Sequence, residues 1–308
     1  MFSYVFKRVI AGFLSLFVLI TITFFLMHAI PGGPFSPSEQ RNVPEEVLKK
    51  IEAKYGLDKP VYVQYGMYLS NLLKFDLGTS FKKMDTTVNE SISAGFPSSA
   101  KIGGLAVLVS LIIGIPLGIT AAVKRGKIAD WISMIFATIG ISVPSFVISV
   151  LLMYLLCQKF RILPSVGLST WKHMILPVFC LAFSPIAYIT RLTRSSMLEV
   201  MRQDYIRTAR SKGVIETWVI FKHALRNSII PVVTYLGPLV AALLTGSFVI
   251  EKLFSIPGIG RYFVNAISDR DYAVILGLTI FFGGLVILCN ILVDIMYVVI
   301  DPRVKIDD

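Results

Sequence analysis

The sequence predicts an all-α integral membrane protein, a bundle of six transmembrane helices with both termini on the cytoplasmic side. Three observations predict this fold class. The chain has 308 residues, of which 55% are hydrophobic, more than the roughly 45–50% of soluble domains. The apolar residues occur in blocks, and most blocks exceed the ~20 residues that cross a bilayer. Lys and Arg gather between alternate blocks, as they do in cytoplasmic loops.

Six apolar blocks are expected to span the membrane. They are residues 9–30, 102–123, 132–157, 173–190, 229–250 and 273–300. The first follows Lys7 and Arg8, but it is too long for a signal-peptide core and lacks a small-x-small cleavage site, so we expect an uncleaved helix. The fourth is short and contains Pro177 and Pro185. We still expect it to cross the membrane, because without it the basic loops would not fall on the cytoplasmic side. Gly and Pro recur in the spans, which fits either close packing or a bundle that changes shape.

The basic residues predict the orientation. With both termini inside, fifteen Lys and Arg residues fall in cytoplasmic segments and seven in the short outside segments. The long outside loop holds eight more, but long loops translocate largely regardless of charge. The chain therefore divides into an N-terminus with the first helix (1–30), an extracellular helical loop (31–100) and a core domain (101–308) that contains a cytoplasmic loop at 191–226. The net charge of +11 then indicates cytoplasmic loops and anionic lipid, with no nucleic acid.

Several site classes find no support in the sequence. Cys157, Cys180 and Cys289 lie inside apolar blocks, where thiols are usually small core side chains, so we expect no disulfide. The three histidines are far apart, and no HExxH or CxxC motif occurs, so no metal site is expected. A secondary transporter would need charges at mid-span. The one ionisable span residue of note, Asp294, lies near the inner end of the sixth span, where we expect it to pair with a basic residue such as Arg303.

The outside loop contains two predicted helices. The stretch "PEEVLKKIEAKYG" (44–56) has Pro at the first helical position and Gly at the end, which is typical of a short helix. A second set of apolar and aromatic residues follows at helical spacing. These are Val61, Tyr65, Tyr68, Leu69, Leu72 and Leu73. This pattern predicts a helix on the outer membrane surface, and a docking surface for a soluble partner is the alternative.

The inside segment is also predicted to be helical. The stretch "SSMLEVMRQDYIRTARSKG" (195–213) predicts one helix, with Ser195 or Ser196 capping its start and Gly213 ending it. A second helix, "ETWVIFKHALRN" (216–227), leads into the fifth span. Solvation or the positive-inside rule accounts for the charges, but neither accounts for a helix–Gly–helix structure. The segment therefore indicates a docking element.

Four stretches resemble one family in order along the chain. They are "DYIRTARSKG" (204–213), "YGLDKPVYVQYGMYLSNLLKFDLGTSF" (55–81), "GSFVIEKLFSIPGIGRYFVNAISDRDY" (246–272) and "VDIMYVVIDPR" (293–303). The chain resembles a permease subunit of an ABC importer, more narrowly the B-type permease of the oligopeptide and dipeptide uptake systems. The resemblance implies a type I importer transmembrane domain in the bacterial cytoplasmic membrane. Stretch 204–213 resembles that family's E-A-A-x-x-x-G coupling loop.

The sequence departs from the general coupling-loop pattern in two places. Arg207 stands where the glutamate is expected, although Ala209 and Gly213 are in step. The expected Ile-x-Leu-Pro ending is absent, because Leu225 is followed by Arg226. The peptide-importer branch is similar in both respects, so we interpret the loop as a subfamily variant.

The resemblance also implies partners and coupling residues. A homologous second permease would complete the pathway, two cytoplasmic ATPase subunits would bind ATP and Mg, and an extracellular or periplasmic protein would deliver peptide. The chain has no G-x-x-x-x-G-K-[S/T] motif and therefore no P-loop of its own. The residues implied in ATPase coupling are Asp204, Tyr205, Arg207, Thr208, Ala209, Arg210, Lys212 and Gly213.

Within the coupling loop, Ala209 would allow close approach and Gly213 would end the helix with a positive φ. Arg207, Arg210 and Lys212 would offer charge-assisted contacts. Candidate residues of the substrate path are the polar span residues Ser142, Ser145, Ser149 and Thr245, although such side chains often bond to their own helix. The cargo is expected to be oligopeptide. Dipeptides, signalling peptides, glutathione and nickel chelates remain alternatives within the family, and a secondary transporter or a membrane enzyme remains one outside it.

Overall fold

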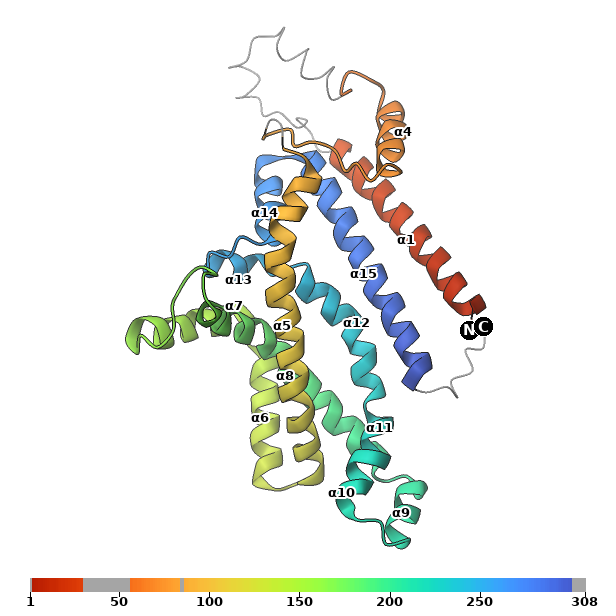
Figure 1. Ribbon diagram of the computed structural model, residues 1–308, viewed down its shortest axis with the longest axis vertical. Coiled ribbons are helices and arrows are strands. Elements are labelled where there is room, and N and C mark those ends of the chain that lie inside the picture. Colours follow the sequence, from red (N-terminus) through yellow and green to blue (C-terminus); the bar gives the residue numbers. More distant parts are fainter. Residues whose placement is uncertain (1, 30–55, 84–85, 301–308) are drawn as a thin grey trace.

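The computed structural model describes residues 2–29, 56–83 and 86–300 of the chain. Its helices in chain order are α1 (Phe2–Ala29), α4 (Val61–Leu72), α5 (Val88–Val123), α6 (Ile128–Ser142), α7 (Ser145–Leu152), the π-helix η1 (Met153–Lys159), α8 (Trp171–Val200), α9 (Asp204–Ser211), α10 (Glu216–Trp218), the π-helix η2 (Val219–Ala224), α11 (Leu225–Ser228), α12 (Ile230–Leu244), α13 (Phe248–Leu253), α14 (Ile259–Asp269) and α15 (Tyr272–Ile300). The described part has no strand, and the molecule is elongated, with α4 at one end and α9 and α10 at the other (Figure 1). The predicted helix at 44–56 lies outside the described residues, except for Gly56.

Five of the predicted blocks form helices long and apolar enough to cross a membrane. They lie in α1, α5, α8, α12 with α13, and α15. The short fourth block is part of α8, which continues through Pro177 and Pro185. In its most apolar stretch, 67% of the residues are buried, against 11% in α1. The helix with the shortest predicted span is therefore the one that the bundle encloses most.

The third predicted span, 132–157, contains a sharp bend. It forms α6 and then α7 with η1, which are bent by 106° at the break. The cause is Pro144, which lacks an amide N–H and excludes the preceding residue from the α-helical region. Val143 is accordingly extended, with φ −91° and ψ 125°. The pair is either a broken span or a re-entrant segment, and it gives the sixth candidate crossing.

Helix α5 is much longer than the predicted second span. It begins at Val88 inside the predicted outside loop, where Thr87 and Glu90 form a reciprocal capping box. Further along, glycines allow close contact with α8. A Cβ atom at Gly114 would come within 2.9 Å of the Ile189 side chain, and one at Gly118 within 2.7 Å of the Thr190 carbonyl. Small residues at this spacing let two helix backbones approach closely.

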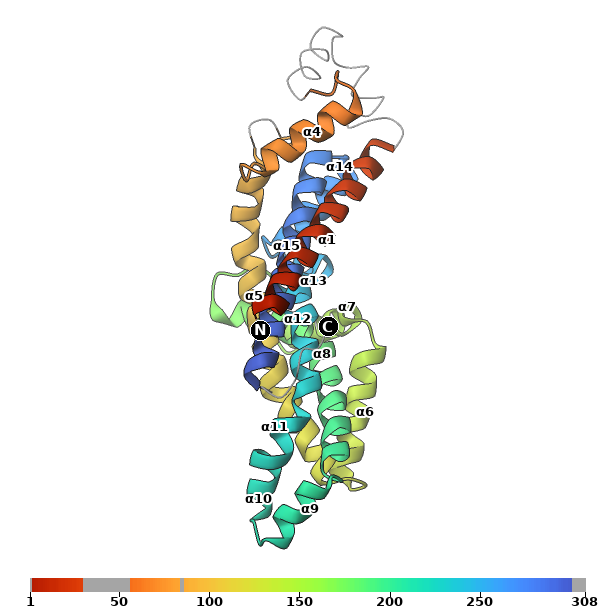
Figure 2. The ribbon, with the colours of Figure 1, turned by 90° about the vertical axis from the view of Figure 1, so that its right-hand side faces the viewer.

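Three apolar clusters lie along α5. Val88 belongs to a cluster with α14 and α15, and Ala106 to the central cluster with α8, α12 and α13. Near the other end, Ile119 packs in a cluster with α9 and η2. Figure 2 shows α5 running lengthwise through the molecule, from beneath α4 toward the end that carries α9. Helix α5 therefore links the two ends of the bundle through continuous packing.

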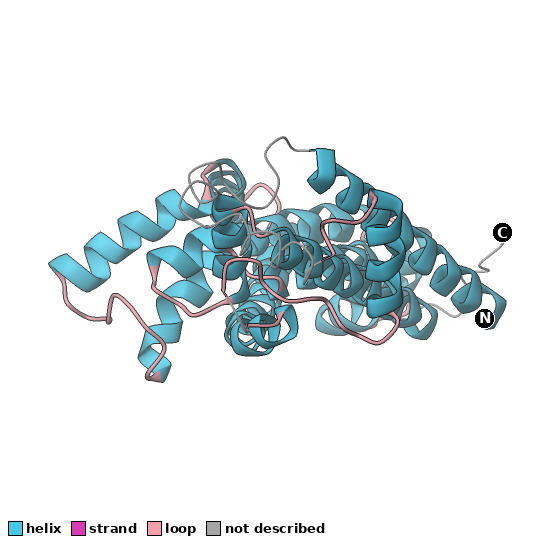
Figure 3. Ribbon diagram, turned by 90° about the horizontal axis from the view of Figure 1, so that it is seen from above, coloured by secondary structure: helices cyan, strands magenta, loops and turns pink. Residues whose placement is uncertain are grey.

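Helices α1 and α15 pack together on one side of the bundle (Figure 1). Seen from above, the described residues form helices and loops alone (Figure 3). Arg8 on α1 pairs with Asp294 on α15, with 3.3 Å between Nε and Oδ2. The sequence predicted a basic partner for Asp294, and Arg8 fills this role, whereas Arg303 lies outside the described residues. Helix α4, confirmed as a helix, crosses the other end of α1, where Tyr65 is hydrogen-bonded to Thr21 at 2.6 Å.

Candidate functional site

The predicted coupling segment is built from two separate helices before Gly213, and the prediction of one helix over 195–213 was wrong. Helix α8 continues to Val200, so Ser195 and Ser196 lie inside it and cap nothing. The chain then turns, because Gln203 is extended, with φ −70° and ψ 149°. A new helix, α9, begins at Asp204. The break places α9 at the far end of the molecule, beside α10 (Figure 1).

Gly213 ends α9 as predicted. Its φ is +76°, in the region that side-chain-bearing residues disfavour. Its N–H donates to the Arg210 carbonyl at 2.9 Å, and the Val214 N–H donates to the Ala209 carbonyl at 3.2 Å. These two bonds form a Schellman motif. No atom lies within 4 Å of a Cβ placed on Gly213, so the requirement for glycine is conformational.

The inner face of α9 packs on the chain itself. Ile206 is fully buried and Ala209 is 9% exposed. Both belong to a cluster with Val219 and Ala224 of η2 and with Met197 of α8. Ala209 was predicted to allow close approach. Its small side chain lies against neighbours within the chain, and its role in ATPase coupling stays a prediction.

The outer face of α9 is polar and exposed. The side chains of Asp204 and Arg207 are almost entirely exposed, with a loose 3.9 Å contact between them. Thr208 donates to the Asp204 carbonyl at 3.0 Å, and Lys212 is exposed at the C-cap. Tyr205 accepts a hydrogen bond from Asn227 at 2.7 Å, which fixes α9 to α11. A rigid helix therefore presents a polar face outward.

Arg210 joins α9 to the next helix. Its guanidinium donates two hydrogen bonds to the Glu216 carboxylate, at 3.1 and 2.7 Å. These bonds raise the pKa of Arg210 and lower the pKa of the Glu216 carboxyl below its ordinary value. The charge that was predicted to contact a partner is thus already balanced within the chain. All three predicted basic residues are exposed, and Arg207 and Lys212 are the two that do not pair with Glu216.

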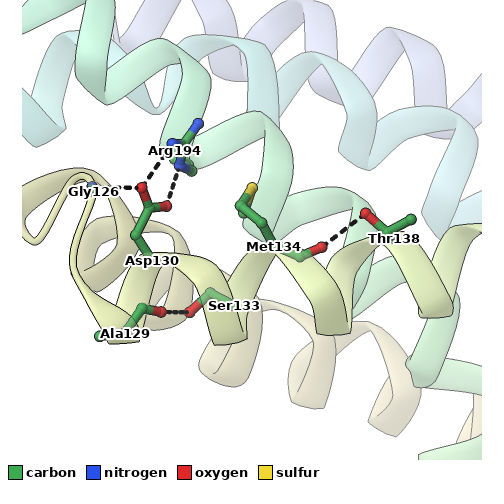
Figure 4. A network of polar contacts seen from close by, with 7 residues as sticks. All are labelled: Gly126, Ala129, Asp130, Ser133, Met134, Thr138 and Arg194. Carbon is green, nitrogen blue, oxygen red and sulfur yellow. Dashed lines mark hydrogen bonds and ion pairs between the residues drawn. The ribbon is translucent and has the colours of Figure 1, made fainter.

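A second ion pair lies near the end of α8 that leads to α9 (Figure 4). Arg194 on α8 donates to both oxygens of Asp130 on α6, at 2.6 and 2.9 Å. The Gly126 N–H donates to the same carboxylate at 2.9 Å. Asp130 is only 5% exposed. The pair fixes α6 to α8. It was not predicted, because Arg194 was expected only as a basic residue of the cytoplasmic loop.

The four candidate path residues lie at the ends of helices α6, α7 and α12 or inside α7. Ser142 ends α6 and is exposed, while Ser145 begins α7. Ser149 is buried and donates to the Ser145 carbonyl at 2.7 Å. Thr245 caps α12 and donates to the Ala242 carbonyl at 3.0 Å. Ser149 and Thr245 therefore bond to their own helices, and the lining of the substrate path stays a prediction.

Comparison with known families decides the class of protein. Residues 114–306 match the model of the binding-protein-dependent transport system inner membrane component. Residues 1–102 match the N-terminal model of the same transport system membrane component. The chain belongs to this family. It is therefore a multi-pass permease subunit of an ABC transport system in the bacterial cytoplasmic membrane.

Curated relatives match the chain over its whole length. It is 46% identical over 306 residues to the dipeptide transport system permease protein DppB of Bacillus subtilis, which covers 99% of both chains. It is 44% identical over 307 residues to the oligopeptide transport system permease protein OppB of Haemophilus influenzae and to that of Salmonella typhimurium, which covers 99% of this chain and all of theirs.

Proposed function

We propose that the chain is a permease subunit of an ATP-driven importer of peptides, with oligopeptides as its main cargo. It would form the translocation path with a homologous second permease. Two cytoplasmic ATPase subunits would hold ATP and Mg, and an extracellular or periplasmic binding protein would supply peptide. The observation that carries the proposal is α9, which is anchored through Ile206 and Ala209 and exposes Asp204, Arg207 and Thr208 at one end of the bundle. The names of the relatives support peptides as the cargo class.

The proposed topology has six spans with both termini inside. The Arg8–Asp294 pair supports it, because it joins the start of the first span to the inner part of the last. An even number of crossings puts these two ends on the same side. The bent pair of α6 with α7 and η1 would then count as the third crossing.

In this mechanism, α9 passes motion from the ATPase to the spans. ATP binding would draw the two ATPases together and displace α9. Its buried face packs on η2 and belongs to one apolar cluster with Ile119 near the end of α5 and Met197 of α8. Because close-packed interiors transmit displacement, α5 and α8 would move with α9 and switch the path between inward- and outward-facing states.

A charge reversal on the outer face of α9 tests the ATPase contact. Arg207→Glu changes a side chain that is 77% exposed, so we expect the chain to fold normally. Reversing a charge at an interface mainly lowers the association rate and changes its salt dependence. We expect fewer ATPase subunits to co-purify with the complex. The matched control is Lys172→Glu, an exposed residue at the opposite end of α8. Equal ATPase recovery in both variants would contradict the docking role of α9.

Cargo is tested by uptake into proteoliposomes that contain the whole complex. Labelled dipeptide, pentapeptide, glutathione and a nickel chelate are compared with each candidate binding protein. We expect the pentapeptide to give the highest uptake. The relative of 46% identity that is named for dipeptides makes dipeptide import the second candidate. Preferential uptake of glutathione or nickel would contradict peptide import.

A further inference from the structure

Glu251 is a buried carboxylate that the proposed coupling site does not use. It lies on α13 and is 3% exposed. Ser99 of α5 donates a hydrogen bond to Oε1 at 2.6 Å. The Arg261 N–H donates to Oε2 at 3.3 Å, and the Gly260 N–H also bonds to the carboxylate. All three partners donate to the carboxyl oxygens of Glu251.

Three glycines make room for this carboxylate. A Cβ atom on Gly246 or Gly258 would overlap the Glu251 carboxylate, and one on Gly260 would lie 3.0 Å from Oε2. These glycines and the glutamate all belong to the stretch "GSFVIEKLFSIPGIG". The positions of the glycines in this stretch are thus those that lie against the Glu251 side chain. A methyl group added at one of these glycines would push the carboxylate away from its donors.

The hydrogen bonds of Glu251 tie two helices together. Gly258 is the N-cap of α14, so the Gly260 and Arg261 N–H groups belong to the first turn of that helix. These are donors that a helix leaves unpaired. Ser99 binds the same carboxylate from α5 and also accepts a hydrogen bond from the Ile259 N–H at 2.8 Å. Glu251 therefore caps α14 and attaches it to α5.

The attachment point is connected to the α9 cluster. From Ser99, α5 continues to Ile119, about 30 Å further along the helix axis. Ile119 belongs to the same apolar cluster as Ile206 and Ala209 of α9, which pack on η2. We propose that Glu251 is a positioning residue that makes α13 and the start of α14 move with α5. Displacement of α9 would then reach the segment that follows α12. This inference rests on the proposed function, because it names the element that the coupling helix moves.

The test is the number of peptides imported per ATP hydrolysed by the reconstituted complex. Ser99→Ala removes the donor that links α5 to Glu251. We expect α5 to move without α14, so ATP hydrolysis continues while import per ATP falls by about tenfold, the effect of one hydrogen bond to a charged group. The matched control is Ser91→Ala. Ser91 is buried on the same helix but donates to Thr87 near the start of α5, at 3.2 Å, so its ratio should not change.

A second variant separates positioning from folding. Glu251→Gln keeps the size of the side chain, but its amide nitrogen cannot accept hydrogen bonds. We expect the same loss of import per ATP as in Ser99→Ala. An unchanged ratio in either assembled variant, or a proportional fall in hydrolysis and import, would overturn the proposal. A failure of the proposed function itself would be distinguishable, because the unsubstituted complex would then not import peptide with ATP.

Discussion

Two of the buried carboxylates in the described residues, Asp130 and Glu251, are held in opposite ways. Asp130 meets a counter-ion, because Arg194 donates two hydrogen bonds to it. Glu251 is held by the Ser99 hydroxyl and by backbone N–H groups, and no salt bridge to it occurs in the described part of the chain. Asp130 attaches α6 to α8 near the coupling helix, and Glu251 attaches α14 to α5. An ion pair thus holds the helices together near one end of the bundle, and hydrogen bonds from a hydroxyl and the backbone do so near the other.

The difference decides what each carboxylate demands of the rest of the chain. A paired ion can be replaced together with its partner, because apolar side chains of similar volume often serve equally well. A carboxylate held by backbone dipoles needs close approach of the backbone, and therefore the glycines at 246, 258 and 260. We expect Asp130 and Arg194 to tolerate replacement of both residues together. At the Glu251 site, we expect no larger residue to be tolerated in place of the glycines while the carboxylate is present.

The largest effect is expected from removing one partner of the Asp130 pair. Arg194→Met leaves a buried carboxylate without its counter-ion, which destabilises a protein by about 3–5 kcal/mol. Thermal unfolding of the purified complex in detergent measures this loss. The control is Arg191→Met, which changes an exposed arginine on the same helix and should have little effect.

The double variant Asp130→Leu with Arg194→Met sharpens this first prediction. Because both charges are removed together, we expect most of the lost stability to return. If the double variant is as unstable as Arg194→Met alone, the pair has a role beyond charge balance. In that case the contrast with Glu251 would fail.

An intermediate effect is expected at the glycines around Glu251. Gly258→Ala places a methyl group against the carboxylate, and overpacking of this kind costs about 1–3 kcal/mol. In a Glu251→Ala background, the same substitution should cost almost nothing further, because the atoms in conflict are gone. Gly284→Ala is the control, since a Cβ there has no neighbour within 4 Å. Additive losses in the double variant would refute the packing explanation.

The smallest effect is expected from the exposed pair of Arg210 and Glu216. Because the pKa of Glu216 is lowered in the folded chain, the pair stabilises α9 above the ordinary carboxyl pKa, and this is lost as the pH falls through the lowered value. Surface pairs contribute about 0–1 kcal/mol. We expect Arg210→Gln to remove the acid dependence of the stability of α9 and to change little else. Proteolysis of the loop between pH 3 and 7 measures this stability, and the range includes the usual glutamate pKa of about 4.3. An unchanged acid dependence would count against the pair.

The sequence predicted features that depend on local composition. Apolar length located five helices, and Gly213 was identified as a helix end because its role depends on one backbone angle. A kink is what proline in a span favours, but the size of the bend at Pro144, 106°, could not be predicted, because hydropathy measures the length of an apolar block and not its path. The break before Asp204 was missed because Gln203 carries no strong breaking signal, so tertiary packing decided it.

The two carboxylate sites show the same limit in the candidate sites. Asp130 and Arg194 are 64 residues apart, so no local pattern could join them. Glu251 did leave a local pattern, the glycines around it, and this stretch contributed to the family resemblance. Its physical reason became visible only when Ser99 was placed beside it, 152 residues away. The buried face of Ala209 likewise depends on η2, which follows α9 in the chain.

ATP-driven peptide uptake by the complete complex in proteoliposomes tests the central claim most directly, with two substitutions at Gly213. Asn tolerates a positive φ, whereas a β-branched residue does not. We predict that Gly213→Asn imports peptide close to the normal rate, and that Gly213→Val loses most ATP-driven import because α9 is no longer held in place. Uptake without ATP, or equal uptake by the Gly213→Val variant, would contradict the account.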